Sequence, residues 1–147
     1  MAWGILPRMR FSIHADGGAR GNPGPAGAGA IVRDGAGKVV AEISEYLGKT
    51  TNNVAEYTAI LRGLGALEAH LGEKAKRASV HVSMDSELVV RQMKGEYRIK
   101  HPNLVPLSQK VKMLVMKFLS VSFSHIPREK NADADALANA AMDRRRL

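Results

Sequence analysis

The chain has 147 residues, a length typical of a single domain. With 45% hydrophobic and 24% charged residues, its composition is that of a globular protein and excludes a disordered or fibrous chain. The formal net charge of +8 favours a polyanionic partner, either nucleic acid or an acidic membrane surface. Because cysteine is absent, disulfides, thiolate zinc sites and a cysteine nucleophile are excluded, and any metal must bind oxygen or imidazole ligands.

We expect one domain over residues 9–143, since no repeat, low-complexity tract or linker divides the chain. Residues 1–8 have the composition of a flexible leader, or reflect a start codon upstream of Met9. Their sequence does not predict a signal peptide, because no basic segment precedes Ile5 and Leu6. Residues 144–147 form a basic tail, for which a solvated helix end is favoured over phosphate contacts. No apolar run approaches the ~18 residues of a membrane-spanning helix, so the sequence predicts a cytoplasmic protein with no membrane partner, and we expect a monomer.

The first third of the chain predicts three antiparallel strands. Residues 10–16 alternate, with Phe11 and Ile13 on one face, and this period of two is typical of a strand. Residues 17–25 are rich in glycine and proline, so a turn is expected there. Strands over residues 28–33 and 38–47 flank a turn sequence at residues 34–37, which predicts a hairpin and therefore a three-stranded meander.

The rest of the chain predicts helices that alternate with strands. After Asn53, leucine and isoleucine recur at helical spacing, and Gly72 is well placed to end that helix. Strands are expected over residues 80–84 and 120–126, and helices over residues 87–93, 107–118 and 132–142. The order βββαβααβα predicts an α/β fold, with a five-stranded mixed sheet (three antiparallel strands, then parallel ones) flanked by helices.

Four carboxylates do not fit an ordinary surface or core pattern. Asp16 and Asp85 each end a core-like strand, and if the two strands run parallel they share one rim of the sheet, where open α/β sheets place ligands. Glu56 precedes Ile60 by four residues, which places a carboxylate on the apolar stripe of its helix. Asp135 lies at the start of the last helix. Taken singly, each of these acids could instead be a turn or capping residue.

Four acids on one rim of a basic chain are harder to explain by capping. Clustered carboxylates repel by a few kcal/mol at an effective dielectric of about 20 unless a cation neutralises them. Oxygen ligands without cysteine favour Mg²⁺ or Mn²⁺. Two such ions about 4 Å apart would prepare a water molecule and stabilise the leaving oxygen in phosphodiester hydrolysis. The sequence therefore predicts the site of a metal-dependent nuclease.

Four separated motifs carry a resemblance to a known family. They are residues 16–25 (DGGARGNPGP), residues 51–56 (TNNVAE), residues 84–86 (MDS), and a last segment with His125, Asn131 and residues 135–138 (DALA). In this order they make the chain resemble type 1 ribonuclease H over nearly its whole length. The chain lacks the extra basic helix with a tryptophan that some bacterial members carry. It therefore looks like the short bacterial and archaeal variety without this protrusion.

The resemblance implies a ribonuclease H-like fold and endonucleolytic cleavage of the RNA strand of RNA–DNA hybrids, with 5′-phosphate and 3′-hydroxyl ends. It implies that four carboxylates form the catalytic set and bind two Mg²⁺ or Mn²⁺ ions: Asp16, Glu56, Asp85 and Asp135. Asp133 remains a rival for the fourth position. His125 would assist proton transfer or product release, and the alternative is an ordinary surface histidine.

The resemblance also implies contacts with the sugar–phosphate backbone of the substrate. Glycines would allow close approach, and neutral side chains would donate or accept hydrogen bonds without reading sequence; the residues are Gly17, Gly18, Asn22, Asn53, Ser86 and Asn131. Thr51, with Asn22 and Arg33, would hold a phosphate of the DNA strand. Threonine and asparagine beside a helix are also ordinary caps.

A short loop replaces the protrusion. Tyr97, Arg98, Lys100 and His101 either supply a reduced grip on the substrate or form a solvated loop, and double-stranded RNA stays open as a second substrate. Two other functions also stay open. The chain could be a hybrid- or duplex-binding module with little turnover, or a nuclease of the resolvase or integrase kind built on a related sheet.

Overall fold

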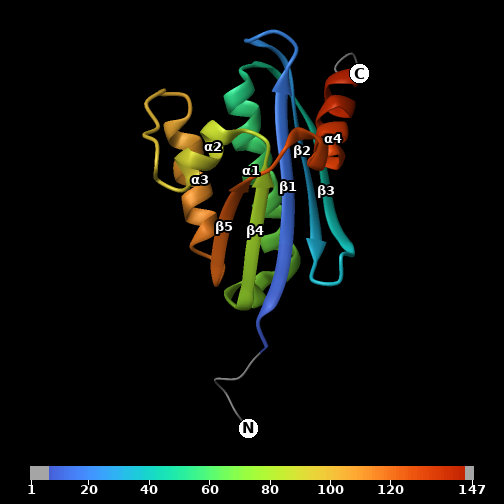
Figure 1. Cartoon of the computed structure of the whole chain (residues 1–147), viewed down its shortest axis with the longest axis vertical. Helices are drawn as coiled ribbons and strands as arrows, with labels where there is room; N and C mark the ends of the chain where they lie inside the picture. Colours follow the sequence, from blue (N-terminus) through green and yellow to red (C-terminus); the bar gives the residue numbers. More distant parts are fainter. Residues whose placement is uncertain (1–6, 145–147) are drawn as a thin grey trace.

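The computed structural model describes residues 7–144, and its elements follow the predicted order (Figure 1). The strands are β1 (Met9–Ala19), β2 (Gly24–Asp34), β3 (Val39–Thr50), β4 (Ala78–Met84) and β5 (Ser120–His125). The helices are α1 (Asn52–Leu71), α2 (Glu87–Met93), α3 (Val105–Val115) and α4 (Ala132–Asp143). Two short 3₁₀ helices, η1 (Gly72–Arg77) and η2 (Arg128–Lys130), were not predicted. Residues 1–6 of the expected leader and 145–147 of the expected tail lie outside the described residues.

The five strands form one mixed sheet in the order β3-β2-β1-β4-β5. Strands β1, β2 and β3 pair antiparallel, whereas β4 is parallel to both β1 and β5. The chain reaches β4 through α1, and it reaches β5 through α2 and α3. The predicted fold, with three antiparallel strands followed by parallel ones, is therefore confirmed.

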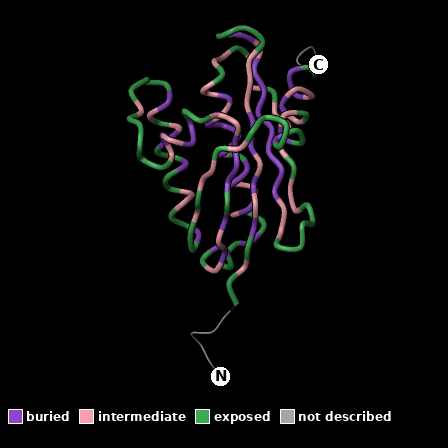
Figure 2. The backbone as a smooth tube through the Cα atoms, viewed as in Figure 1, coloured by how far each residue is buried: buried purple, intermediate pink, exposed green. Residues whose placement is uncertain are grey.

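Helices cover the two faces of the sheet unequally. Helix α1 lies on one face, where Ile13 of β1 and Ile60 and Leu64 of α1 belong to a single buried core. Helix α4 packs on the opposite face, mainly against β2, and it also contacts β1 and β3 (Figure 1). Buried residues are concentrated in the central strands and along α1 (Figure 2). Within residues 7–144, no helix has both the length and the apolar character needed to cross a membrane.

The first hairpin extends beyond its predicted ends. Strand β1 continues to Ala19 and β2 already begins at Gly24, with Gly17 paired to Ala28 and Ala19 paired to Ala26. The turn predicted over residues 17–25 was therefore too long. Its glycines fit the strands because they let other backbones come close, so they do not break the pairing.

Candidate active site

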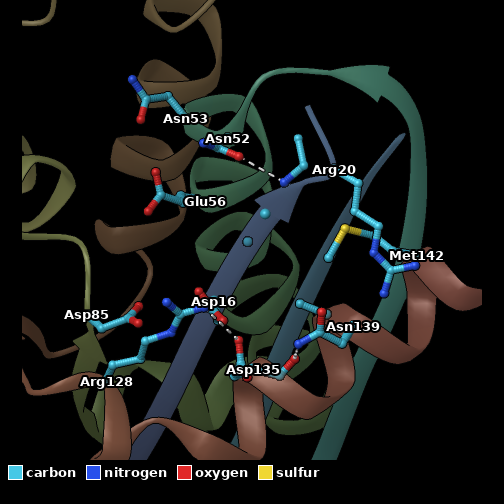
Figure 3. Close-up of a pocket in the computed structure, with 14 residues that line it drawn as sticks. Asp16, Arg20, Asn52, Asn53, Glu56, Asp85, Arg128, Asp135, Asn139 and Met142 are labelled. Carbon is cyan, nitrogen blue, oxygen red and sulfur yellow. Dashed lines mark hydrogen bonds and ion pairs between the residues drawn. The ribbon is translucent and has the colours of Figure 1, made fainter. Parts of the chain in front are cut away.

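An open pocket of about 480 Å³ lies on the rim of the sheet, at the C-terminal end of β1. One carboxylate from each of four segments lines it: Asp16 of β1, Glu56 of α1, Asp85 after β4, and Asp135 of α4. The close-up shows these four side chains around a common space (Figure 3). The structure thus brings together the four acids that the sequence singled out.

Strand register brings the first two acids side by side. His14 of β1 lies opposite Ser83 of β4 in the parallel pairing, so Asp16 and Asp85, two residues further on, reach the same level. Asp16 is 8% exposed, whereas Asp85 is half-buried in the loop that follows β4. We expected Asp16 to end its strand, but β1 continues to Ala19, because it remains paired with β2 after its pairing with β4 has stopped.

Glu56 reaches the pocket because α1 lies unusually close to β1. A Cβ atom built on Gly17 would lie 2.3 Å from the carbonyl carbon of Ala55 and 2.4 Å from the backbone nitrogen of Glu56. Only a residue without a side chain permits this contact of two backbones. Gly17 therefore positions the helix turn that carries Glu56, which is a structural role in addition to the substrate contact that the resemblance implies.

Asp135 is positioned by a second close contact of backbones. A Cβ atom on Gly29 of β2 would lie 2.3 Å from the carbonyl oxygen of Ala134, so α4 packs directly on the sheet. Asp133, the rival for the fourth position, faces away from the acidic pocket. Its Oδ2 accepts a hydrogen bond of 2.6 Å from the guanidinium of Arg33, and both residues line a separate small cavity. The geometry favours Asp135.

Burial and mutual repulsion change the acidity of the buried carboxyls. Burial, then the charge of Asp85 and a side-chain hydrogen bond with Asp135, raises the pKa of Asp16 to about 8. Burial also raises the pKa of Glu56 to about 7; a hydrogen bond with Ser86 opposes this shift, and the charge of Asp85 adds to it. Without a cation, the pocket therefore disfavours full ionisation of its acids.

The donor set fits hard divalent cations. All four groups are carboxylates, which Mg²⁺ and Mn²⁺ prefer, and the energetic cost of their ionisation falls when a cation neutralises them. Within residues 7–144, no three acidic or histidine side chains already stand as a closed metal cage. Mg²⁺ does not require one, because it is commonly held by one or two carboxylates, water and substrate phosphate.

Two residues expected to contact substrate do not line the acidic pocket. Asn131 is 1% exposed; its Nδ2 donates to the carbonyl oxygen of Ala15 at 2.9 Å and lies 3.5 Å from Oδ1 of Asp85. Asn131 therefore lies beneath the surface of the site and holds Asp85 close to β1. Arg33 lies at the opposite end of β2 from Thr51, since Gly24 pairs with Thr50 there. Arg33 therefore cannot bind the same phosphate as Thr51 and Asn22, and this part of the prediction is wrong. The sequence alone does not show which end of a strand faces the pocket.

Other expected residues lie at or near the pocket. Gly18 and Asn53 line it. The Thr51 hydroxyl accepts from the backbone nitrogen of Val54 at 3.3 Å and so caps α1, which is the alternative considered above. Asn22 accepts a 3.1 Å hydrogen bond from the backbone nitrogen of Asn52, joining the first hairpin to α1.

Ser86 combines two contacts. Its hydroxyl accepts from the backbone nitrogen of Val89 at 3.4 Å, which caps α2, and it also hydrogen-bonds Glu56. His125 is the exposed last residue of β5. It pairs with Met84 of β4, the residue directly before Asp85. It does not itself line the acidic pocket.

Sequence reasoning missed several residues of the pocket, notably Arg128, Asn52 and Arg20. The Arg128 guanidinium, whose side chain is 81% exposed, lies 4.0 Å from Oδ1 of Asp135 at the mouth of the pocket (Figure 3). The position of Arg128 between His125 and Asn131, within the last motif, was the signal in the sequence that could have identified it. The loop from 94 to 104 contains no additional helix, and its Tyr97 packs 5.4 Å from the guanidinium of Arg91.

The sheet order and the acidic pocket on its rim define a ribonuclease H-like protein. A family model described as Reverse transcriptase-like matches residues 14–141. The chain is 44% identical over 137 residues to the bifunctional protein Rv2228c of Mycobacterium tuberculosis, which covers 92% of this chain and 36% of that protein. It is 39% identical over 141 residues to ribonuclease HI of Halobacterium salinarum, covering 95% of this chain and 68% of that protein.

A solved structure extends the comparison. LC11-RNase H1, isolated from compost by a metagenomic approach and solved in complex with an RNA/DNA hybrid, is 48% identical and superposes with a TM-score of 0.87 over 93% of this chain and 99% of that chain. This chain belongs to the ribonuclease H family. The matched region spans 36% of the length of Rv2228c.

Proposed function

We propose that this chain hydrolyses the RNA strand of RNA–DNA hybrids endonucleolytically, leaving 5′-phosphate and 3′-hydroxyl ends, and that residues 9–143 are the unit that carries this activity. The observation that carries the proposal is the convergence of four carboxylates from distant segments in one open pocket. The hybrid bound to LC11-RNase H1 supports the choice of substrate.

Asp16, Glu56, Asp85 and Asp135 would hold two divalent ions, with Mg²⁺ and Mn²⁺ as the candidates. When bound, such ions lower the pKa of water and stabilise charge on phosphate oxygens. The chain's own residues fix the positions of these carboxylates: Gly17 admits α1, Gly29 admits α4, and the amide of Asn131 joins Asp85 to β1.

Other groups would bind and orient the substrate. Gly18 and Asn53 offer small and neutral contacts to the sugar–phosphate backbone, which suits recognition of the 2′-hydroxyl without base reading. The Arg128 guanidinium at the mouth of the pocket can bind a phosphate oxygen. His125, exposed beside this edge, is the candidate for moving a proton at the leaving oxygen or for releasing product.

Cleavage of a hybrid with a labelled RNA strand tests the proposal. With Mg²⁺ or Mn²⁺ the wild-type protein should cut the RNA strand, and Asp85→Asn should reduce the rate by at least about a hundredfold, since a lost metal ligand costs more than the 10–100-fold typical of groups that only orient one. Undiminished cleavage by Asp85→Asn would remove the mechanism. Double-stranded RNA and a four-way DNA junction, assayed in parallel, separate ribonuclease H activity from the related nuclease reactions.

A further inference from the structure

The outer face of α3 carries large apolar side chains that are open to solvent. Met113 and Met116 are 67% and 84% exposed, and Leu119, just beyond the helix, is 54% exposed. Residues three apart on a helix lie on the same side, so the two methionines form one patch. Single exposed apolar residues need no explanation, whereas larger contiguous apolar patches mark interaction sites.

A groove of about 330 Å³ lies next to this patch, between α2, α3 and β5. Its walls are mainly apolar and include Val115 of α3 and Phe123 of β5. Among the described residues that line the groove, two are charged, and both are basic: Lys94 and Lys112. Lys112 and Met116 are four residues apart, so the groove and the methionine patch form a continuous surface.

This part of the chain is positively charged without compensation from its own segment. No acidic residue occurs between Glu96 and Glu129, whereas Lys110, Lys112 and Lys117 all fall within or just after α3. Met116 and Lys117 line a neighbouring pocket that includes Glu68 and Glu73, and Glu73 is paired with Lys76 at 3.1 Å. The groove itself contains Lys94 and Lys112 and no acidic residue among its lining, so the positive charge without a local acid lies in the groove.

We propose that this region, the α3 surface formed by Lys94, Lys112, Met113, Val115 and Met116, docks an acidic protein segment that carries apolar side chains. One apolar side chain of the partner would enter the groove, and its carboxylates would meet the two lysines. Methionine suits such a surface because its flexible side chain adapts to different partner shapes.

The chemistry of the groove favours a peptide over other polyanions. A nucleic-acid backbone would use the lysines but leave the apolar walls and the methionines in water. An anionic membrane is flat on this scale and would not fill a groove. The α3 surface and the acidic pocket share no lining residue, and α3 and α4 lie on opposite sides of the molecule (Figure 1). Docking therefore leaves the acidic pocket open, and the proposal does not depend on cleavage.

Binding of a synthetic peptide to the full chain tests this proposal. The probe is a short fluorescein-labelled peptide in which aspartate alternates with leucine, and its comparison peptide has glycine in place of each leucine. Fluorescence anisotropy should show binding of the first peptide only. Lys112→Glu should weaken that binding by about tenfold or more, because an attraction becomes a repulsion. Met116→Ser should weaken it as well, and since Met116 is highly exposed the variant should keep its fold, which circular dichroism checks.

Matched controls make the result specific to this surface. Lys38→Glu makes the same charge change in the exposed turn between β2 and β3, and Leu88→Ser removes an exposed apolar side chain of α2 outside the groove. Both should bind the peptide like the wild type. The proposal is overturned if the glycine peptide binds equally well, if Lys38→Glu weakens binding as much as Lys112→Glu, if unlabelled hybrid displaces the peptide, or if phosphatidylglycerol vesicles bind through Lys112 and Met116 while the peptide does not.

Discussion

Asp133 and Asp135 are only two residues apart, but they face different surroundings. Asp135 lines the acidic pocket, whereas Asp133 pairs with Arg33 in another cavity. We expect Asp135→Asn to reduce hybrid cleavage by at least about a hundredfold and Asp133→Asn to change it little, because exposed ion pairs contribute only ~0–1 kcal/mol. Steady-state rates of both variants on one substrate check this. A large loss in Asp133→Asn with little loss in Asp135→Asn would show that the fourth position has been assigned to the wrong acid.

Gly17 and Gly18 are neighbours with different steric surroundings. A Cβ on Gly17 would meet the backbone of Ala55 at 2.3 Å, whereas one on Gly18 would meet only Cε of Met142 at 3.6 Å, an ordinary contact. Gly17→Ala should therefore displace α1 and Glu56 and lower the free energy of unfolding by ~1–3 kcal/mol, the usual cost of overpacking. Gly18→Ala should leave stability nearly unchanged. Urea unfolding of the two variants measures the difference, and similar midpoints would contradict it.

Sequence reasoning found the carboxylates because each broke a local pattern. Glu56 stood on an apolar helical stripe, and Asp16 and Asp85 followed buried strands. It did not show that Arg33 and Asn131 lie outside the pocket lining, because their surroundings depend on contacts between distant segments: the pairing of β2 with β3, and the approach of the last motif to β1. Arg128 was missed because an arginine in a loop breaks no local pattern.

At the level of whole elements, the contact between α4 and β2 decides where the fourth acid lies. Gly29→Ala would place its Cβ 2.3 Å from the carbonyl oxygen of Ala134, so α4 must move away from the sheet. We expect a loss of stability of ~1–3 kcal/mol together with a marked loss of cleavage, since Asp135 moves with the helix.

Gly65→Ala is the matched control, and we expect it to raise the stability of the protein where Gly29→Ala lowers it. Gly65 lies inside α1, and its added Cβ would meet only Cδ1 of Leu114, at 4.0 Å. Alanine is a better helix former than glycine, so this variant should gain ~0.5–1 kcal/mol. Thermal unfolding and cleavage assays of the two variants test the pair. If Gly29→Ala keeps full activity, the position of α4 does not control the site.

Element order was predictable, and so were the bounds of α2, but the lengths of β1 and β2 were not. The alternation from Phe11 to Ala15 and the helical stripe of α1 identified the core elements. Strands β1 and β2 were predicted too short, because the glycines near their ends read as a turn when their neighbours in space are unknown. Gly17 and Gly27 belong to the strands since each lies against a helix backbone.

At the scale of the whole molecule, a protein with a formal net charge of +8 contains a pocket lined by four acids. Hybrid binding should therefore weaken as salt rises, with log K falling linearly against log salt by about 0.9 for each phosphate contacted. Binding measured in the cleavage-deficient Asp85→Asn protein gives this slope. Adding Arg128→Ala should make it shallower by about 1, the value for one phosphate contact.

Arg62→Ala supplies the control for this measurement. Arg62 of α1 donates to Glu45 at 2.9 Å and does not line the pocket, so its removal should leave the slope unchanged. An unaltered slope in the Arg128 variant would mean that this guanidinium does not bind phosphate.

The middle of β1 is a support shared by all parts of the site. It contains Asp16, it admits α1 at Gly17, and the carbonyl oxygen of Ala15 receives the amide of Asn131. Amide protons at the centre of a sheet commonly exchange only when the whole protein opens. Catalytic competence in this chain should consequently have no separate melting step: on heating, cleavage should persist until cooperative unfolding and then disappear with the native state.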